Sequence, residues 1–587
     1  MLFAILLLYA GGCRPRAPAT SGADSEVVYH GASTRIRGFD PVGAGDVASS
    51  LAISRIYEGL LQYAYLDRPY RLEPCLAEGW PEISPDRLIY TFRVRQGIHF
   101  QDDPCFTATG GQGRELTADD FVYSIKRVAD LKNSSTGYWA FNNRIKGLDE
   151  FRAGTAGDDP TDYDQPVAGL HAPDRYTLRI ELTRPYPQLL WIMAMHYAFA
   201  VPREAVDYYG REFVSHPVGT GPYILKSWRR NYRMEFERNR KWTETGRQEY
   251  HPSRGTPDDA ERGLLADAGK PLPLTDRIVE YVVNDSSTMW LMFLGEQLAS
   301  AGISRDNWDA VITGDRRLND ELARRGIVLH ATPTLTTFYI GFNMDDPLLG
   351  ANRKLRQALT CAFNSKQYEE FYNNRIMRAV SPIPPGIEGF ADIATPYPFD
   401  PDLARRLLAE AGFPEGRDPD TGRRLTLTID IGRANDPEAR AATELLVDFM
   451  SRIGVALTPV YSSWPAFLER LSRRQVQLFQ LGWVADYPDA ENFLQLFYSH
   501  NHSPGPNHSN YRNEEYDELY ERIGIMAGDD PERQALCRRM VEILIEDCPW
   551  IFTHHPMSYS LHHGWLKNFK PHDFPYGMGK YYNIGRH

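Results

Sequence analysis

The sequence lacks the short motifs that mark common classes of enzyme. Its 587 residues contain no GxSxG nucleophile elbow, no HExxH metal motif, no phosphate-binding loop and no dinucleotide-binding fingerprint. Long runs of Lys or Arg are also missing, and the net charge of −12 argues against a nucleic-acid-binding protein. We therefore expect neither an enzyme nor a nucleic-acid partner.

Cysteines are few, and none of the six is spaced as CxxC. A zinc site is therefore not expected, and we predict no cofactor. If the chain is exported, disulfide bonds become possible, with Cys75–Cys105 and Cys537–Cys548 as the conceivable pairs. The sequence alone does not decide the pairing.

No hydrophobic run is long enough to cross a bilayer, which takes roughly 20 apolar residues. The apolar stretch 1–10 instead fits the core of a signal peptide. The small residues before Cys13 resemble a bacterial lipobox, which predicts a lipoprotein signal over 1–13, a lipidated Cys13 and a flexible tether over 14–26. No Lys or Arg precedes the apolar stretch, so an ordinary secretory signal with an incidental Cys13 is the alternative.

Aromatic residues are plentiful, at 12% of the chain, which suits pockets for amphipathic ligands. A chain of this length should divide into two to four domains. Local patterns predict a helix over 51–61, strands over 89–95 and 223–225, and a helix that begins after Thr117 as its N-cap. The helix 401–411 should end at Gly412.

The stretch 476–489 combines features of a binding site. The mostly apolar run 476–481 predicts a strand bounded by Gly482, and Trp483 and Asp486 follow directly. A carboxylate beside a Trp at the end of a buried strand could hold a cation against an apolar wall. The alternative is a loop Asp that caps a helix beginning near Ala490.

These and other blocks resemble the periplasmic oligopeptide- and dipeptide-binding proteins, the extracellular receptors of peptide-importing ABC transporters. Matching blocks run from about residue 27 to about residue 560. They are IYEGL (56–60), LAEGW (76–80), LTADDFVYS (116–124), PVGTGPY (217–223), ERN (237–239), LRQAL (355–359), LLAEAGF (407–413) and Trp483-Val484-Ala485-Asp486.

The resemblance implies an α/β, two-lobed periplasmic-binding-protein fold of type II with an extra α/β domain. Lobe I would comprise 27–57, 201–335 and 555–587, the extra domain 58–200, and lobe II 336–554. A monomeric receptor would close its lobes around short peptides and deliver them to an inner-membrane ABC permease with its ATPase subunits. Its expected location is the periplasm or cell envelope of a bacterium, anchored to the membrane by the lipid on Cys13.

The same resemblance implies roles for individual residues. Asp486, in the Trp-x-Ala-Asp motif that includes Ala485, would bind the α-ammonium of the peptide. Gly482, Trp483 and Val484 would pair with the peptide backbone from one side, and Gly45, Asp46 and Val47 from the other. Tyr138 and Trp464 would line side-chain pockets, although each could equally be a core aromatic.

One position departs from the family pattern. Oligopeptide receptors commonly carry an Arg shortly before the Trp, where it meets the peptide carboxylate, and Gln480 stands in that neighbourhood here. A neutral amide supplies no charge, so another cation would be needed. Two segments, 104–115 and 243–274, also differ from the family and are predicted to be surface loops, with docking to a partner as the alternative.

The histidines at 554–555 and 562–563 leave room for another ligand. Paired His residues can bind a transition metal, but flanking patterns predict two strands joined at 556–557. Adjacent residues of a strand point to opposite faces, so satisfied or solvated histidines are favoured. The open functional alternatives are the same fold with nickel, haem, a glycan or an opine as ligand, or a signalling or adhesion lipoprotein.

Overall fold

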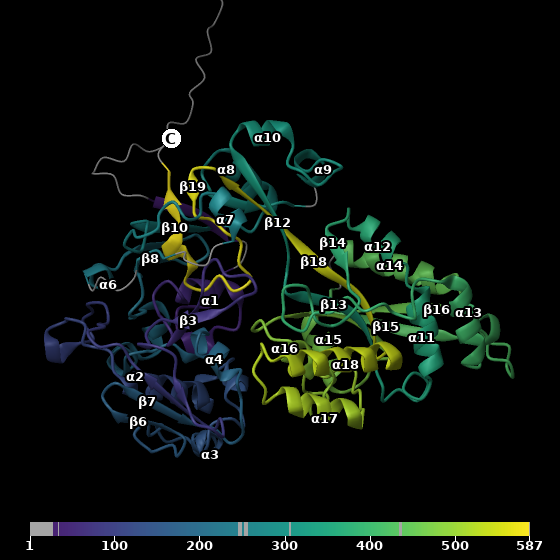
Figure 1. The fold of residues 1–587 in the computed structure, drawn as a ribbon, viewed down its shortest axis with the longest axis horizontal. Coiled ribbons are helices and arrows are strands. Elements are labelled where there is room, and N and C mark those ends of the chain that lie inside the picture. Colours follow the sequence, from purple (N-terminus) through teal and green to yellow (C-terminus); the bar gives the residue numbers. More distant parts are fainter. Residues whose placement is uncertain are drawn as a thin grey trace, which may run out of the picture.

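The computed structural model describes residues 27–32, 35–244, 249–251, 256–304, 307–433 and 437–585. The predicted signal and lipobox, with Cys13, and the tether 14–26 therefore lie outside the described residues. Figure 1 shows two large bodies joined by extended strands, with a smaller body below the first. Within the described ranges, no helix has the length and apolar character needed to cross a membrane.

The first large body, here lobe I, is built on a four-stranded sheet of order β1-β10-β9-β8. β1 runs parallel to β10, and the other neighbours are antiparallel. Helix α1 (Val47–Ile53) packs near this sheet (Figure 1). The strands are β1 (Val27–Ala32), β8 (Tyr223–Arg229), β9 (Arg233–Arg238) and β10 (Arg277–Val282).

The two ends of the described chain meet in lobe I. Val28 of β1, Ala299 and Leu566 form one small cluster in which each residue is 0–1% exposed. The first strand and the segment that begins near Leu566 are thus parts of one structural unit.

The smaller body, here the extra domain, has an antiparallel sheet of order β4-β5-β7-β6. Its helix α2 (Ala118–Ala129) is nearly all buried and begins with a capping box between Thr117 and Asp120, as predicted. The other elements are β2 (Leu61–Tyr63), β3 (Leu72–Pro74), β4 (Glu82–Ile83), β5 (Ile89–Arg93), α3 (Leu148–Gly154), β6 (Leu170–Asp174), β7 (Thr177–Glu181) and α4 (Leu189–Ile192).

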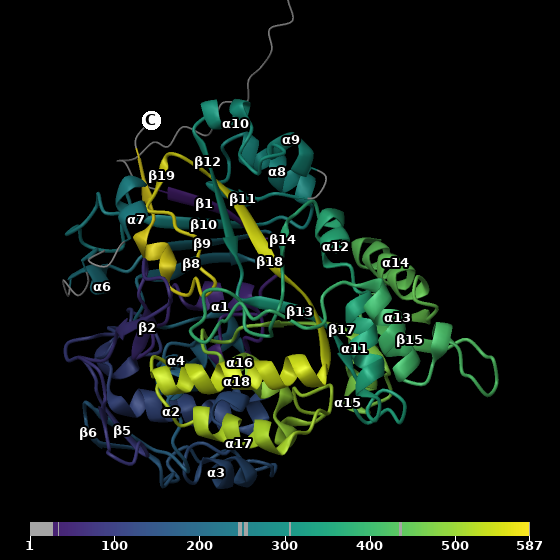
Figure 2. The same ribbon diagram turned by 45° about the vertical axis from the view of Figure 1, so that its right-hand side comes forward.

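The second large body, here lobe II, surrounds the strands β13-β17-β15-β16 of the longest sheet. Figure 2 shows α17 and α18 in front of the extra domain, and Arg87 of that domain donates a hydrogen bond to the carbonyl oxygen of Ile525 at 2.7 Å. The elements are β13 (Thr336–Phe342), α11 (Arg353–Ala362), α12 (Ser365–Phe371), α13 (Pro401–Glu410), β15 (Thr426–Ile431), α14 (Pro437–Ser451), β16 (Ala456–Tyr461), α15 (Trp464–Ser472), β17 (Leu478–Val484), α16 (Glu491–Leu494), α17 (Glu514–Ile523) and α18 (Pro531–Asp547).

A single long strand, β18 (Trp550–His563), crosses between the lobes (Figure 1). Its first part pairs with β13 of lobe II, and its second part pairs with β11 (Ser300–Gly302) and β12 (Ile327–Pro333). The prediction of two strands joined at 556–557 is therefore wrong. Pro556 lies opposite Ile376 of a further partner strand, β14 (Ile376–Arg378), and its carbonyl oxygen accepts from Thr334 N at 2.9 Å.

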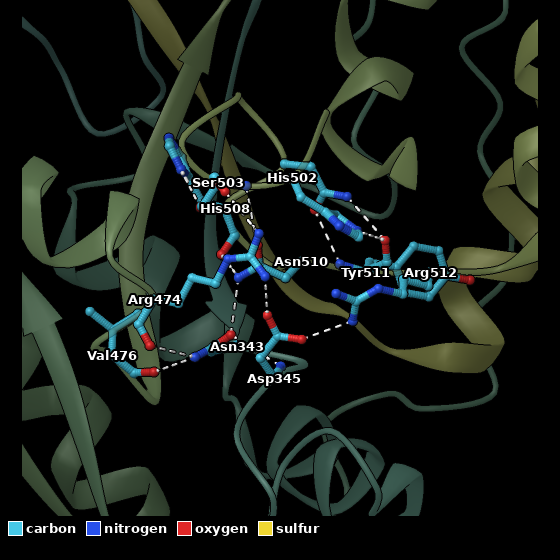
Figure 3. A network of polar contacts seen from close by, with 11 residues as sticks. Asn343, Asp345, Arg474, Val476, His502, Ser503, His508, Asn510, Tyr511 and Arg512 are labelled. Atoms are coloured by element: carbon cyan, nitrogen blue, oxygen red, sulfur yellow. Dashed lines mark hydrogen bonds and ion pairs between the residues drawn. The ribbon is translucent and has the colours of Figure 1, made fainter. Parts of the chain in front are cut away.

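A network of polar contacts holds the beginning of β17 against the end of β13 (Figure 3). Asn343, which follows β13, donates to the carbonyl oxygens of Arg474 and Val476 at 3.1 and 2.9 Å. Asp345 forms ion pairs with Arg474 and Arg512, each at 2.8 Å. These contacts fix the register of the strand that carries the predicted site.

Several local predictions are confirmed and others are wrong. β8 contains the predicted strand 223–225, β5 covers residues 89–93 of the predicted strand 89–95, and Gly412 follows α13 with a φ of 94° that favours glycine. The predicted helix 51–61 is wrong, because α1 begins four residues earlier, at the cap provided by Asp46, and ends at Ile53. Leu61 already belongs to β2.

The two disulfide pairs that the sequence left open, Cys75–Cys105 and Cys537–Cys548, do not form. Cys75, Cys105, Cys361, Cys537 and Cys548 are all buried, and none is bonded to another described cysteine.

The insertions 104–115 and 243–274 contain buried residues, although both were predicted to be surface loops. Within 104–115, residues 107–110 are exposed, but Phe106 is 3% exposed. In the described part of 243–274, Asp259 is 1% exposed and pairs with Lys570 at 2.7 Å. Both insertions are thus anchored in the core at one point.

Candidate functional site

The Trp483-to-Asp486 motif lies at the end of β17, in the middle of lobe II. The strand extends through Gly482 to Val484, so the predicted boundary at Gly482 is wrong. Glycine is nonetheless required there, because a Cβ atom at this position would lie 2.7 Å from the ring of Phe338 on the neighbouring strand β13. Because position 482 has no side chain, the ring of Phe338 can pack directly against the backbone of β17.

One edge of β17 is open along the motif. On one side β13 pairs with the whole strand, from Leu478 to Val484. On the other side β15 pairs only with Leu478 to Gln480 and ends at Ile431. In the described part of the chain no strand continues this ladder along 481–484, so these residues present unpaired backbone groups to an added strand.

Asp486 is oriented by a single neighbour, Asn492. The Asn492 side-chain amide donates to the carboxylate of Asp486 at 3.2 Å, and its oxygen accepts from the Asp486 N–H at 3.1 Å. The same oxygen accepts from the indole N–H of Trp483 at 2.9 Å. Because Asn492 is fully buried, it fixes the carboxylate and the indole relative to each other.

The carboxylate of Asp486 has no Lys or Arg partner among the residues that the structure describes. Burial raises its pKa to about 6, the nearby charge of Glu491 adds to this rise, and the hydrogen bond from Asn492 opposes it. A partly buried carboxylate that has lost hydration and has no cationic partner would be stabilised by a positively charged group of a ligand.

The helix-cap alternative for Asp486 is wrong. Helix α16 begins at Glu491, and Ala490 precedes it without a side-chain cap. The carboxylate of Asp489 instead accepts from the N–H of Glu491 at 2.8 Å and pairs with Arg533 at 2.5 Å. Asp489 and Arg533 are 8% and 2% exposed, so this buried pair anchors the loop and leaves Asp486 uncommitted.

Three tyrosines from outside lobe II lie near enough to Asp486 to respond to its charge. Burial raises the pKa of Tyr63, Tyr197 and Tyr576, and the charge of Asp486 contributes further to each of these shifts, bringing Tyr576 to about 12. These tyrosines were missed in the sequence because they come from three distant segments with no shared motif. They place the carboxylate at the junction of lobe II with the rest of the molecule.

The segment 45–47 lies next to this aromatic group. Tyr197 donates its hydroxyl to the carbonyl oxygen of Ala44 at 2.8 Å. The side chain of Asp46 caps α1, accepting from Ser49 N at 2.8 Å, so it is already used. Val47 is 56% exposed, which leaves the backbone of this segment and one apolar side chain accessible.

The two predicted pocket aromatics differ in their surroundings. Tyr138 is buried, donates its hydroxyl to Asp149, and has the guanidinium of Arg152 4.0 Å above its ring, which favours a structural role. Trp464 is 48% exposed at the start of α15, so it is no core residue. The neighbour of Tyr138, Trp139, is 42% exposed and lies 6.4 Å from the ring of Tyr197.

A pocket lies beside Gln480 of β17, between the two lobes. It has a volume of ≈ 260 Å³, and Gln480, Arg433, Arg375 and His554 are among its walls. Arg375 pairs with Glu438 at 3.3 Å. Burial, followed by the charges of His555 and Arg433, lowers the pKa of His554 to about 3, so this histidine is neutral. The pocket thus offers guanidinium groups where the sequence offered only Gln480.

The four clustered histidines do not converge on one point. His554 stacks on Phe338 at 4.8 Å, and the Nδ1 of His555 lies 3.1 Å from the Thr336 carbonyl oxygen. His562 and His563 interact with other groups in lobe I. No group of three or more His, Cys, Asp or Glu residues in the described ranges could hold a metal ion.

A comparison with protein families assigns the chain. The family model described as bacterial extracellular solute-binding proteins, family 5, middle region, matches residues 71–505. The chain belongs to this family. The predicted family is thereby confirmed, and its members are solute-binding proteins rather than enzymes.

The proteins to which this solute-binding protein is similar are named for different ligands. Heme-binding protein A of Haemophilus influenzae is 26% identical, over 96% of this chain and 93% of its own. Di/tripeptide-binding protein 2 of Pseudomonas aeruginosa is 24% identical, over 83% and 81%. The structure of the periplasmic binding protein DppA from Helicobacter pylori in complex with the peptide STSA has a TM-score of 0.69 at 22% identity, covering 96% of this chain and 99% of that one. This likeness confirms the two-lobed α/β type II fold.

Proposed function

We propose that this solute-binding protein captures short peptides between its lobes and delivers them to an ABC-type permease. The observation that carries the proposal is the desolvated carboxylate of Asp486, without a cationic partner among the described residues, at the end of a strand with one open edge. All peptides share an α-ammonium, a backbone and a carboxylate. The site offers a complementary group for each.

The ammonium end is supported by the electrostatics of Asp486. An ammonium placed against this carboxylate would form a charge-assisted hydrogen bond in a partly dry environment, where such bonds are strong. The aromatic rings of Trp483, Tyr197 and Tyr576 exclude water around it.

The backbone is supported by the unpaired edge along 481–484. A peptide would extend the ladder from the point where β15 ends, with main-chain hydrogen bonds that do not depend on its side chains. The segment 45–47 would contact it from lobe I. Trp464 would lie at the rim as a predicted pocket wall, and Tyr138 would act through the packing of the extra domain.

The carboxylate end is supported by the guanidinium-lined pocket beside Gln480. Gln480 lies six residues before Asp486 on an extended chain, which is about 20 Å along the strand. The long side chain of Arg433 shortens the distance that a ligand must span. This arrangement fits peptides of a few residues, with Arg433 in the role that the family's usual Arg has lost.

The remaining expectations complete the proposal. We infer lobe I over 27–57, 201–335 and 555–587, the extra domain over 58–200 and lobe II over 336–554, with β18 as a connection that hinge closure would bend. A lipid on Cys13 would anchor a monomeric receptor to the cell envelope, where it meets its permease. One acyl chain anchors only marginally, so multi-chain lipidation is part of this inference.

Mass spectrometry of ligands that co-purify with the protein tests the function. Heterogeneous short peptides are the expected result. Since one relative is named for haem, recovery of haem alone, or of a single sugar or metal complex, would replace the peptide function with that ligand. Lysates of cells grown with isotope-labelled peptides would serve as the matched positive control.

A further inference from the structure

Lobe I contains a cavity that the proposed peptide contacts do not use. Its volume of ≈ 410 Å³ falls within the range of small-molecule sites, roughly 300–1,000 Å³. It lies between α1, the strands β1 and β10, and the C-terminal segment. Its walls include Ala48, Leu51, Arg55, Glu280, Phe569 and Tyr582.

This cavity adjoins the proposed peptide site at two places. Val47, which belongs to the segment 45–47, is also part of the cavity wall. Pro575 and Gly577 line the cavity as well, and Tyr576 between them is close enough to Asp486 for its pKa to rise with the charge there. A substituent of a peptide held at Asp486 could therefore enter the cavity from its rim.

The charged side chains in the cavity wall pair with each other, so the wall carries no net charge. Arg55 pairs with Glu280 through Nη2 at 2.5 Å, and the two side chains are only 12% and 7% exposed. The Nη1 group of Arg55 is buried without a hydrogen-bond partner in the described chain. His30 in the wall is neutral, because burial and the charge of Arg55 lower its pKa to about 4.

We propose that this cavity receives a bulky, uncharged substituent of the bound peptide. The inference rests on the proposed peptide function. Arg55 and Glu280 neutralise each other, so a charged substituent would lose its hydration without gaining a counter-charge, whereas an uncharged substituent avoids that cost. The volume leaves room for apolar atoms against Leu51, Phe569 and Tyr582.

Titration calorimetry with Ala-Ala-Ala and with the three tripeptides that carry Tyr at one position tests the proposal. The phenol is bulky and uncharged. At least one Tyr peptide should bind about tenfold more tightly than Ala-Ala-Ala, from the added apolar burial. Ala48→Trp fills the cavity from α1, and the ratio of the two affinities should fall to about one.

Ala409→Trp, at an exposed position of α13 in lobe II, is the matched control and should keep the ratio. Ala48→Leu is the smaller filling variant in case the Trp variant unfolds, and thermal unfolding reports on both. A Tyr preference that persists in both filling variants overturns the proposal, as does equal binding of all four peptides to the natural protein. Failure of every peptide, Ala-Ala-Ala included, instead overturns the peptide function itself.

Discussion

Replacement of Asp486 by Asn should make the unliganded protein more stable and should weaken its binding of peptides. The pKa of Asp486 rises from 3.8 to about 6 because the ionised carboxylate is desolvated. That rise corresponds to up to about 3 kcal/mol of free energy by which the ionised group opposes folding. Since the folded pKa lies above the unfolded value, the penalty is absent below pH 3.8 and grows as the pH rises toward 6. Asp486→Asn should therefore raise the free energy of unfolding at pH 7 and leave it nearly unchanged at pH 4, as measured by urea unfolding.

The affinity for peptides should increase with pH over the same range in which the ionised carboxylate destabilises the unliganded protein. With a pKa of about 6, Asp486 is about 90% ionised at pH 7 and about 10% ionised at pH 5. The affinity for a free-amine peptide should thus fall about tenfold between these pH values, while the peptide ammonium stays protonated. In Asp486→Asn the affinity at pH 7 should drop by about 3–5 kcal/mol, and the pH dependence should vanish.

Calorimetry on the same peptide with a free and an acetylated N-terminus decides between this reasoning and a structural role. The natural protein should discriminate strongly between the two peptides, and Asp486→Asn should not. Equal affinities for both peptides in the natural protein would refute the assignment.

Further substitutions separate binding from stability. Arg433→Gln should weaken peptides with a free carboxylate about tenfold or more and leave C-terminally amidated peptides unaffected, since only the former need the guanidinium; calorimetry on matched peptide pairs measures this. Trp464→Ala should lower peptide affinity with little change in thermal unfolding, because the side chain is half exposed. Tyr138→Phe should do the reverse, costing about 1–2 kcal/mol of unfolding free energy through the lost hydrogen bond, with affinity retained. Arg533→Met should cost about 3–5 kcal/mol of stability, because it leaves Asp489 buried without its partner, and a wild-type urea midpoint would contradict that.

The parts of the fold that depend on interactions between residues close together in the sequence could be predicted. The capping box at Thr117 and the glycine after α13 were predictable because their signals lie within a few residues of one another. The length of α1 and the continuity of β18 were not. The first depends on a cap five residues upstream of the apolar pattern, and the second on partner strands from both lobes.

The site was predictable only in part for a similar reason. A compact motif marks Asp486, but the tyrosines near it and the guanidinium groups near Gln480 come from separate segments with no shared motif. The open edge of β17 is likewise invisible in the strand itself. It exists because β15, some fifty residues earlier in the chain, ends at Ile431.

The meeting of the two chain ends in lobe I sets an order on folding during synthesis. Val28 is synthesised long before Leu566, so the cluster that these two residues share cannot form until most of the chain between them has been made. Lobe II can assemble from contiguous sequence in the meantime, since domains generally fold as units. Such distant contacts are entropically slow to form. Lobe I, which contains the proposed contact segment 45–47, is therefore the last to become complete, and we expect no peptide binding before its C-terminal segment is in place.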